Sequence, residues 1–443
     1  MPSTVELSSL RFIKRLALAL ALASAPAFAL QPLPEFLKGA RQANVDQAVA
    51  ARTLEQQEAE SLVSLGRTLP SLSARGTYTR NQFESKIDAS QFLPPGAPSG
   101  GDSAIVIQPF NQLDGYLQLD APILDAASWA RVGAQHANER AARQKVASTL
   151  LDVQKQVALR YSQLVGAQAL RKSAQRSLDA AQANLDLMKI RRQGGVATEL
   201  DVNRATAEVE RSKQSISDAD LTAELSRRAL LTLTGVQPQG EAGPSEDDLG
   251  EEAPLETFLQ SDALPAVAAA AEQRKGAESA ALAAQLALVP SVSASAMEHF
   301  TNATGFTGRS SLYVVTGNLR WQLDLTTFGT MRSQAAAAEV ARLREQGARQ
   351  AALDQIHEAW FRVHNGIAKS RAARAAAASA QAAAARARER SQQGAGTQLE
   401  LIQAERDAFA AEVSRLQADA DLTYARAALR LVAGHPLDEE TNR

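Results

Sequence analysis

A pair of histidines is the feature of this 443-residue sequence whose spacing most directly suggests chemistry. His357 and His364 lie seven positions apart, which places them on one face of a helix and permits a metal site. The sequence has no cysteine, so no disulfide, no cysteine-containing zinc site and no thiol nucleophile is available. We favour polar positions on a solvated or lumen-facing helix for both histidines, and expect no catalytic residue and no bound metal.

Two glycine-rich stretches and one acidic stretch are the other candidate ligand sites. Gly194-Gly195 and Gly394-Ala395-Gly396 lack the lysine of a phosphate-binding loop and the spacing of a dinucleotide-binding turn, so helix capping explains them. Residues 236–262 hold the acidic runs Glu246-Asp247-Asp248 and Glu251-Glu252 between prolines. A solvated linker is favoured there over a metal-binding patch. No cofactor is therefore expected.

Both glycine stretches belong to a turn that occurs twice in the chain. In each copy a glycine in the left-handed conformation ends one helical pattern, a threonine caps the next helix, and an acid three residues later completes a capping box. The duplication predicts a tandem repeat of helical hairpins with one turn at each tip. The two copies are Gly195-Val196-Ala197-Thr198-Glu199-Leu200-Asp201 and Gly394-Ala395-Gly396-Thr397-Gln398-Leu399-Glu400. We expect the small side chains of Val196, Ala197 and Ala395 to be exposed and to have little role in folding.

Long helices are predicted on both sides of each turn. Residues 126–192 contain no proline and would form a helix about 100 Å long if unbroken. Apolar and small residues then recur with the three-four spacing of a coiled coil; they are Val202, Ala205, Val209, Ser212, Ile216, Ala219 and Ala223. The predicted organisation is a first repeat over 30–235 with its hairpin at 126–235, a linker over 236–262, a second repeat over 263–434 with its hairpin at 330–434, and a tail over 435–443.

Each hairpin is preceded by two predicted strands. At Pro70 and Pro290 the apolar period changes from about 3.6 to 2. Strands with one apolar and one polar face are typical of a membrane β-barrel. The predicted strands are 71–82 and 105–121, joined by a loop over 84–104, and 290–302 and 311–325. In the last strand Tyr313, Val315, Leu319, Trp321 and Leu323 share the apolar face, and Thr316, Asn318, Arg320 and Gln322 share the polar face.

The amino terminus predicts export. Residues 1–29 have the basic start, apolar centre and small-residue cleavage site of a secretory signal peptide, so the mature chain is expected to begin at Leu30. The apolar centre is shorter than the roughly 20 residues that span a membrane. The formal net charge is −2, so no strongly basic surface is available for nucleic acid.

Four strands are too few to close a barrel, and open strand edges cannot lie in lipid. Several chains must therefore pool their strands, and their long helices can pool into a tube. The predicted fold class is α+β, dominated by long α-helices. A strand barrel that continues into a helical tube would form a conduit, so the expected function is passage of solutes through the assembly.

Several motifs resemble the TolC-type outer membrane efflux protein family, and the resemblance covers nearly all of the mature sequence. They are the doubled turn, which continues to Ala205 and Ala404, the doubled Pro-Ser-Leu/Val-Ser sequence at Pro70 and Pro290, and Trp321-Gln322-Leu323-Asp324-Leu325.

The resemblance implies a homotrimer with a twelve-stranded β-barrel in the outer membrane of a Gram-negative bacterium and a helical barrel in the periplasm. It also implies an exit duct of a tripartite efflux or type I secretion system. The tips, Gly195 to Thr198 with Asp201 and Gly394 to Thr397 with Glu400, would dock a periplasmic adaptor (membrane fusion) protein that serves an inner-membrane pump.

The approach to the second tip departs from the family. Many members carry acids there, whereas this chain has Arg386, Arg388, Glu389 and Arg390 as its candidate pore constriction. A cation-selective ring of carboxylates is therefore not inferred. The alternative is a soluble periplasmic coiled-coil scaffold, which explains the helices and the signal peptide but gives the four strands no purpose.

Overall fold

The structure is a computed structural model that describes residues 30–88, 104–242, 247–259 and 264–437. Contacts between residues divide the chain into two compact units. The first, called here the hairpin unit, comprises Met1–Ala51, Lys145–Val267 and Ala348–Arg443. The second, called the strand unit, comprises Arg52–Gln144 and Ala268–Gly347. The signal peptide predicted over 1–29 lies outside the described residues.

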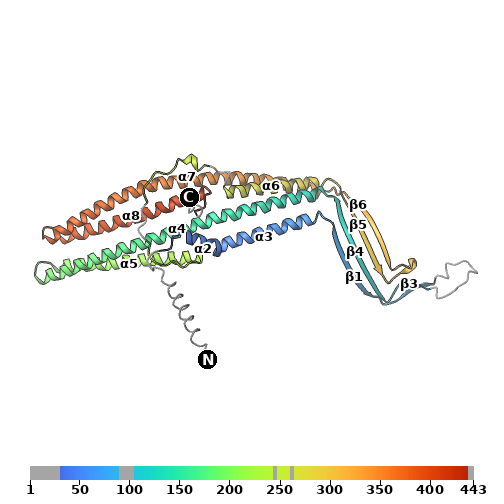
Figure 1. Cartoon of the computed structure of the whole chain (residues 1–443), viewed down its shortest axis with the longest axis horizontal. Helices are drawn as coiled ribbons and strands as arrows, with labels where there is room; N and C mark the ends of the chain where they lie inside the picture. The colour runs from blue at the N-terminus through green and yellow to red at the C-terminus, as the bar shows by residue number, and fades with distance from the viewer. Residues whose placement is uncertain (1–29, 89–103, 243–246, 260–263, 438–443) are drawn as a thin grey trace, which may run out of the picture. The chain divides into compact units, whose positions relative to one another are not determined.

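Two helical hairpins dominate the first unit (Figure 1). Helix α4 (Ala126–Gln193) lies beside α5 (Glu199–Thr234), and α7 (Leu325–Gln392) lies beside α8 (Gln398–Val432). Helices α4 and α7 each have 68 residues. Their high alanine content favours this length, because alanine has the best helix propensity and lets neighbouring backbones approach.

The coiled-coil spacing predicted for α5 is confirmed. Val202, Ala205 and Val209 are buried, and they form one apolar cluster with Ala181, Leu185 and Met188 of α4. We call this group the α4–α5 cluster. Further along α5, Ser212, Ala219 and Ala223 are also buried. Small residues along the contact therefore set the close packing of the two helices.

The helical segment that precedes the first strand is divided at Asn44. The described chain has α2 (Leu33–Ala43) and α3 (Val45–Gly66), and the Asn44 Oδ1 atom accepts a bond of 2.9 Å from the Asp46 N–H at the start of α3. Helix α2 buries Phe36 and Leu37. A short polar side chain that caps the second helix explains the break.

The acidic stretch is not a fully solvated linker, and that prediction was wrong for two of its residues. Arg426 of α8 pairs with Asp247 at 2.8 Å and with Glu252 at 2.5 Å, and it also donates to the Gly250 carbonyl at 2.6 Å. These contacts hold residues 247–252 against α8, next to the short helix η2 (Leu255–Thr257). Glu246 lies outside the described residues.

Four strands form the main antiparallel sheet of the strand unit, in the order β1-β4-β5-β6. They are β1 (Ser71–Arg80), β4 (Asn111–Leu124), β5 (Ser291–Thr301) and β6 (Ser311–Arg320), and helix α6 (Pro265–Leu286) precedes β5. The predicted alternation is present. One face, called the apolar face, exposes side chains such as Leu72, Leu119, Tyr313, Val315 and Leu319. The opposite face, called the polar face, carries residues such as Thr77, Gln118 and Ser295.

Several strand boundaries differ from the expected ones. The expected strand over 105–121 is interrupted at Pro109, which has no N–H to donate to a ladder, so it becomes β3 (Ala104–Gln108) and β4. Strand β3 pairs with β2 (Ser85–Asp88), which begins where a loop was expected. The expected strand over 311–325 ends at Arg320, because Asp324 accepts a bond from the Thr327 N–H at 2.8 Å and caps α7 at Leu325. Within the described ranges, no helix is both long enough and apolar enough to cross a membrane.

Candidate functional site

The two hairpin tips have the same backbone geometry. Gly195 has φ of 74° and Gly394 has φ of 77°, so both lie in the left-handed region. In the first tip the Val196 N–H donates to the Arg191 carbonyl at 2.9 Å, and in the second the Ala395 N–H donates to the Arg390 carbonyl at 2.9 Å. These bonds satisfy carbonyl groups that a helix end leaves free. The structure thus places the predicted tip glycines at the ends of α4 and α7.

Each tip continues into a complete capping box. The Asp201 N–H donates to the Thr198 hydroxyl oxygen at 3.3 Å, and the Thr198 N–H donates to the Asp201 carboxylate at 3.0 Å. The second tip repeats this arrangement with Thr397 and Glu400 at 3.2 and 3.3 Å. The Thr198 hydroxyl and N–H lower the pKa of Asp201. The capping box therefore stabilises α5 fully at pH values above the ordinary pKa of an aspartate. This stabilisation is lost as the pH falls through the lowered pKa of Asp201.

The side chains at the tips differ in exposure. Val196 is 81% exposed, and Ala395 is also exposed. Ala197, however, is only partly exposed and packs against the α4–α5 cluster. The expectation that Ala197 is exposed and free of a folding role was therefore wrong. Gly396 occupies the matching position of the second tip, where an added Cβ atom would lie 3.3 Å from the Arg390 Cβ atom.

The four candidate constriction residues share the last turns of α7 but do not form one cluster. Arg388 pairs with Glu405 of α8 at 3.2 Å, and Arg390 donates to the Ala395 carbonyl of its own turn at 3.3 Å. Glu389 accepts a bond from the Gln393 side chain at 3.3 Å. Arg386 is exposed. Burial raises the pKa of the Glu405 carboxyl, although Arg388 opposes this shift.

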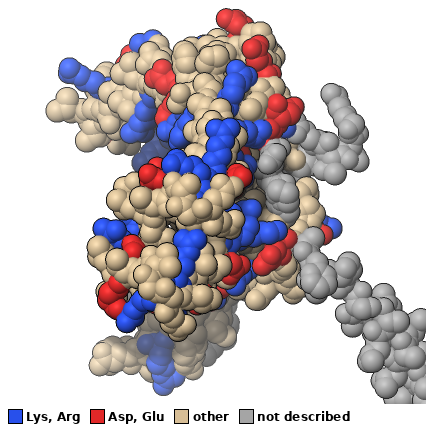
Figure 2. All heavy atoms as spheres, turned by 90° about the vertical axis from the view of Figure 1, so that its left-hand side faces the viewer, with Lys and Arg blue, Asp and Glu red and all other residues tan. Residues whose placement is uncertain are grey.

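Two polar contacts join the hairpins near their tips, and no local sequence pattern predicts either of them. The Arg191 guanidinium donates to the Ser391 carbonyl at 2.9 Å, which links the end of α4 to the end of α7. Arg406 of α8 pairs with Glu208 of α5 at 2.6 Å. Figure 2 looks at the end of the molecule that carries the tips, where basic and acidic side chains are interspersed. The two hairpins are thus connected near their tips by charge-assisted bonds.

Comparison with known proteins decides between a channel and a scaffold. A family model described as outer membrane efflux protein matches residues 40–236 and 261–435. This chain belongs to the outer membrane efflux protein family. The match includes both repeats and both tips, so the resemblance seen in the sequence is confirmed. The alternative of a soluble coiled-coil scaffold is set aside.

Solved structures of outer-membrane channels share the fold of this efflux protein. MtrE of Neisseria gonorrhoeae has a TM-score of 0.76 at 20% identity, over 94% of this chain and 92% of that one. CmeC of Campylobacter jejuni has a TM-score of 0.77 at 18% identity, over 91% of this chain and 86% of that one. No curated protein sequence matches the chain. The structures establish the fold, and the family establishes an exit duct in the outer membrane with a periplasmic extension, as predicted.

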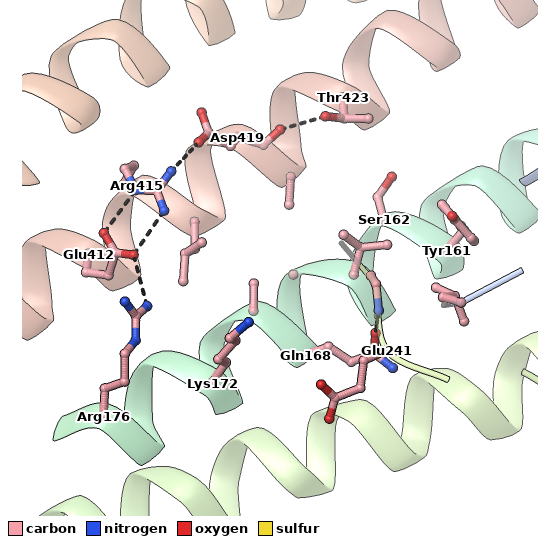
Figure 3. A pocket seen from close by; sticks show the side chains of 17 residues that line it. Tyr161, Ser162, Gln168, Lys172, Arg176, Glu241, Glu412, Arg415, Asp419 and Thr423 are labelled. Atoms are coloured by element: carbon pink, nitrogen blue, oxygen red, sulfur yellow. Dashed lines mark hydrogen bonds and ion pairs between the residues drawn. The ribbon is translucent and has the colours of Figure 1, made fainter. Parts of the chain in front are cut away.

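A cavity of about 350 Å³ lies between α4 and α8 of the efflux protein (Figure 3). On α8, Arg415 bridges Glu412 at 2.9 Å and Asp419 at 3.2 Å. Arg176 approaches Glu412 from α4 at 3.9 Å. The Arg415 guanidinium holds the pKa of Glu412 below its usual value. Since both carboxylates are bound by arginine, they are poorly placed to act as acid or base, and the cluster serves to join the hairpins.

His357 and His364 each contact another group of their own helix, α7. The His357 Nδ1 atom lies 2.8 Å from the Leu353 carbonyl oxygen, and the His364 ring stacks on Trp360 with 5.4 Å between centroids. The part of the chain that the structure describes holds no group of three or more histidine, aspartate or glutamate side chains suited to a metal.

Proposed function

We propose that this efflux protein works as a homotrimer whose strands, four from each chain, close one barrel in the outer membrane. The observation that carries the proposal is the sheet itself. In the described part of the chain, β1 and β6 are the two ends of the strand order, and each has a partner on one side only. Backbone groups at such an edge cannot face lipid. Pairing of β1 with β6 of a neighbouring copy removes both edges and turns the apolar face to lipid and the polar face to a lumen.

Exposed apolar side chains on the long helices support the same assembly. Leu221 and Leu225 of α5 are 60% and 62% exposed, and Phe361 of α7 is 59% exposed. Apolar surface of this kind on long helices marks contact sites for other subunits. Three copies of the two hairpins would form a helical barrel in the periplasm.

The tips are the proposed contact with the rest of an efflux or type I secretion system. Val196 and Ala395 are exposed at the turns and take no part in either capping box. We propose that they dock a periplasmic adaptor (membrane fusion) protein, which passes substrates from an inner-membrane pump. The duct conducts passively and uses no catalytic residue.

Mass measurement of the protein in mild detergent tests the assembly. We expect a mass of three chains together with bound detergent. A stable monomer with its strands formed would contradict the proposal, because the open edges of β1 and β6 would then have no partner.

A further inference from the structure

Two pairs of helices correspond between the two repeats. Helices α3 and α6 have 22 residues each and lead into β1 and β5. Helices α4 and α7 have 68 residues each and follow β4 and β6. Because the lengths are equal, the helices of each pair can be aligned without a gap. We call residues at equal positions in two such helices matched residues.

Helices α4 and α6 pack together within the chain. The Arg140 guanidinium of α4 pairs with Glu272 of α6 at 2.7 Å. A Cβ atom added at Gly276 of α6 would lie 3.5 Å from the Ala137 Cβ atom and 2.8 Å from the Asn138 Oδ1 atom. Glycine on α6 therefore makes room for an asparagine on α4.

The face of α6 that takes part in this contact is covered, whereas the matched face of α3 is exposed. Residues at three-four spacing form the α6 face, and all are half-buried or buried: Glu272, Gly276, Ser279 and Ala283. The matched residues of α3 are all exposed: Arg52, Gln56, Ala59 and Val63. The contrast is clear at the last position, where Ala283 is 3% exposed and Val63 is 58% exposed.

The same contrast distinguishes α4 from α7. Ala137 and Ala141 of α4 are both buried. The matched residues of α7, Ala336 and Val340, are both exposed. Helix α7 therefore exposes the face that α4 uses to contact α6.

The charges on the two exposed faces are reversed together. Glu339 of α7 matches Arg140, and Arg52 of α3 matches Glu272. Reversal of one charge alone would place two like charges opposite one another. Since both are reversed, an α3 and an α7 packed as α6 and α4 are would again bring a base to an acid.

The sizes of the side chains are exchanged in the same way. Gln56 of α3 matches Gly276, and Ala337 of α7 matches Asn138. In the contact of α4 with α6 the larger residue is on α4, and in the matched contact it would be on α3. The volume at this position is therefore kept, as close packing requires.

Arg52 and Glu339 have only local partners in the single chain. Arg52 pairs with Glu55 at 2.6 Å, and Glu339 pairs with Arg342 at 2.5 Å, each three residues away on its own helix. Exposed pairs of this kind contribute little to stability, so their loss costs little. Glu55 also reverses the charge of its matched residue, Lys275, which pairs with Glu272 at 2.7 Å.

We infer that α3 of one chain packs against α7 of a second copy of this chain, with an ion pair between Arg52 and Glu339. The inference rests on the proposed trimer. Pairing of β6 with β1 of the next chain would bring α7 beside that chain's α3, just as β4 and β5 pair where α4 and α6 are in contact.

Disulfide formation in Gln56→Cys with Ala336→Cys tests the inference, and the sequence contains no other cysteine. The matched Cβ distance of 3.5 Å, from Gly276 to Ala137, is within the range of a disulfide. After oxidation of outer-membrane fractions, a denaturing gel without reductant should show a band of three chains in place of the monomer. Gln56→Cys with Ala338→Cys is the matched control, because Ala338 lies about 200° around the helix from Ala336. It should leave the monomer band.

Charge reversal provides a second test if the cysteine variants do not assemble. Arg52→Glu should lower the fraction of trimer that survives mild SDS, and addition of Glu339→Arg should restore it. If the two residues acted only through Glu55 and Arg342, each substitution would break a local pair. The double variant would then be weaker than either single variant, which would overturn the inference.

The outcome also distinguishes this contact from the trimer itself. A trimer of normal mass in which Gln56→Cys with Ala336→Cys forms no disulfide, or forms it within one chain, would overturn the inference and leave the trimer intact. Another molecule would then cover α3. A stable wild-type monomer would overturn the trimer and the inference together.

Discussion

Two glycines fix the points at which the long helices end. Gly195 and Gly394 have positive φ values, and a Cβ atom added at either would meet no other atom within 4 Å. Their requirement for glycine is thus conformational and not steric. Because the signal of glycine, threonine and acid is local, the sequence alone located both turns.

Gly394→Ala is expected to cost about 1 kcal/mol of local stability, because an L residue is strained in the left-handed region. Hydrogen exchange of the amides around the turn measures this. Gly347→Ala is the control, since Gly347 lies inside α7 with open space around it, and alanine there should stabilise the helix by up to about 1 kcal/mol. Equal changes at the two sites would contradict the backbone explanation.

Contacts between residues distant in sequence could not be predicted in this way. The bond from Arg191 to the Ser391 carbonyl joins positions 200 residues apart, and no local pattern encodes it. The packing of Ala197 was also missed, because small residues at turns are usually exposed. Pair contacts of this kind depend on how the two hairpins lie together, which periodicity does not specify.

At the scale of elements, one arginine holds the acidic stretch against α8. The Arg426 guanidinium contacts Asp247, Glu252 and the Gly250 carbonyl, and its side chain is 18% exposed. An acidic run in sequence is usually a solvated segment, so its binding to Arg426 required the structure.

Arg426→Ala is expected to destabilise the stretch by about 3 kcal/mol, since it leaves the partly buried carboxylates of Asp247 and Glu252 without their ion-pair partner. Faster exchange of the Leu249 and Gly250 amides, and faster proteolysis between residues 247 and 258, would show this. Arg362→Ala is the control, because Arg362 pairs with Glu358 on the exposed surface of α7 and should contribute less than about 1 kcal/mol. If residues 247–258 were equally protected from amide exchange and proteolysis in both variants, the stretch would be held by its apolar contacts and not by Arg426.

The alternation of the strands was predictable, whereas their ends were not. Period-two patterns identified both faces of β6, but the interruption at Pro109 and the helix cap at Asp324 moved the boundaries. Trp321 lies beyond β6, and its Nε1 atom donates to the Leu288 carbonyl at 3.1 Å. Leu319 is therefore the cleaner probe of the apolar face.

Leu319→Arg is expected to reduce the amount of trimer in the outer membrane, because a charge that faces the middle of a bilayer costs about 2–4 kcal/mol. Thr316→Arg and Asn318→Arg, on the polar face, should be tolerated since a lumen contains water. Quantification of folded trimer in membrane fractions measures the difference. Equal losses on both faces would mean that the assignment of faces is wrong.

At the scale of the whole molecule, the internal duplication of the chain made its architecture predictable from the sequence. Two copies of the turn, each after two alternating strands, identified the family and the fold class. The sequence does not contain the contacts that the molecule makes with other chains. The tips therefore remain a proposed docking site, and the structure improves the choice of variants that test it.

Val196→Asp together with Ala395→Asp should abolish efflux while the trimer still assembles, because both side chains are exposed and lie outside the capping boxes. An acid there would place a charge in an apolar contact with an adaptor. Ala197→Asp is not a suitable probe, since it would also place a charge against the α4–α5 cluster. Gln214→Asp, on the exposed surface of α5 away from the tip, is the control.

Drug or solvent efflux and outer-membrane trimer should be measured in parallel for each variant. If the tips dock an adaptor, the double variant loses efflux at a normal amount of trimer, and the adaptor no longer co-purifies with it. Full efflux with a normal amount of trimer would remove the docking role from Val196 and Ala395. The two turns would then serve only to reverse the chain, and the contact with the adaptor would have to lie on the sides of the helices.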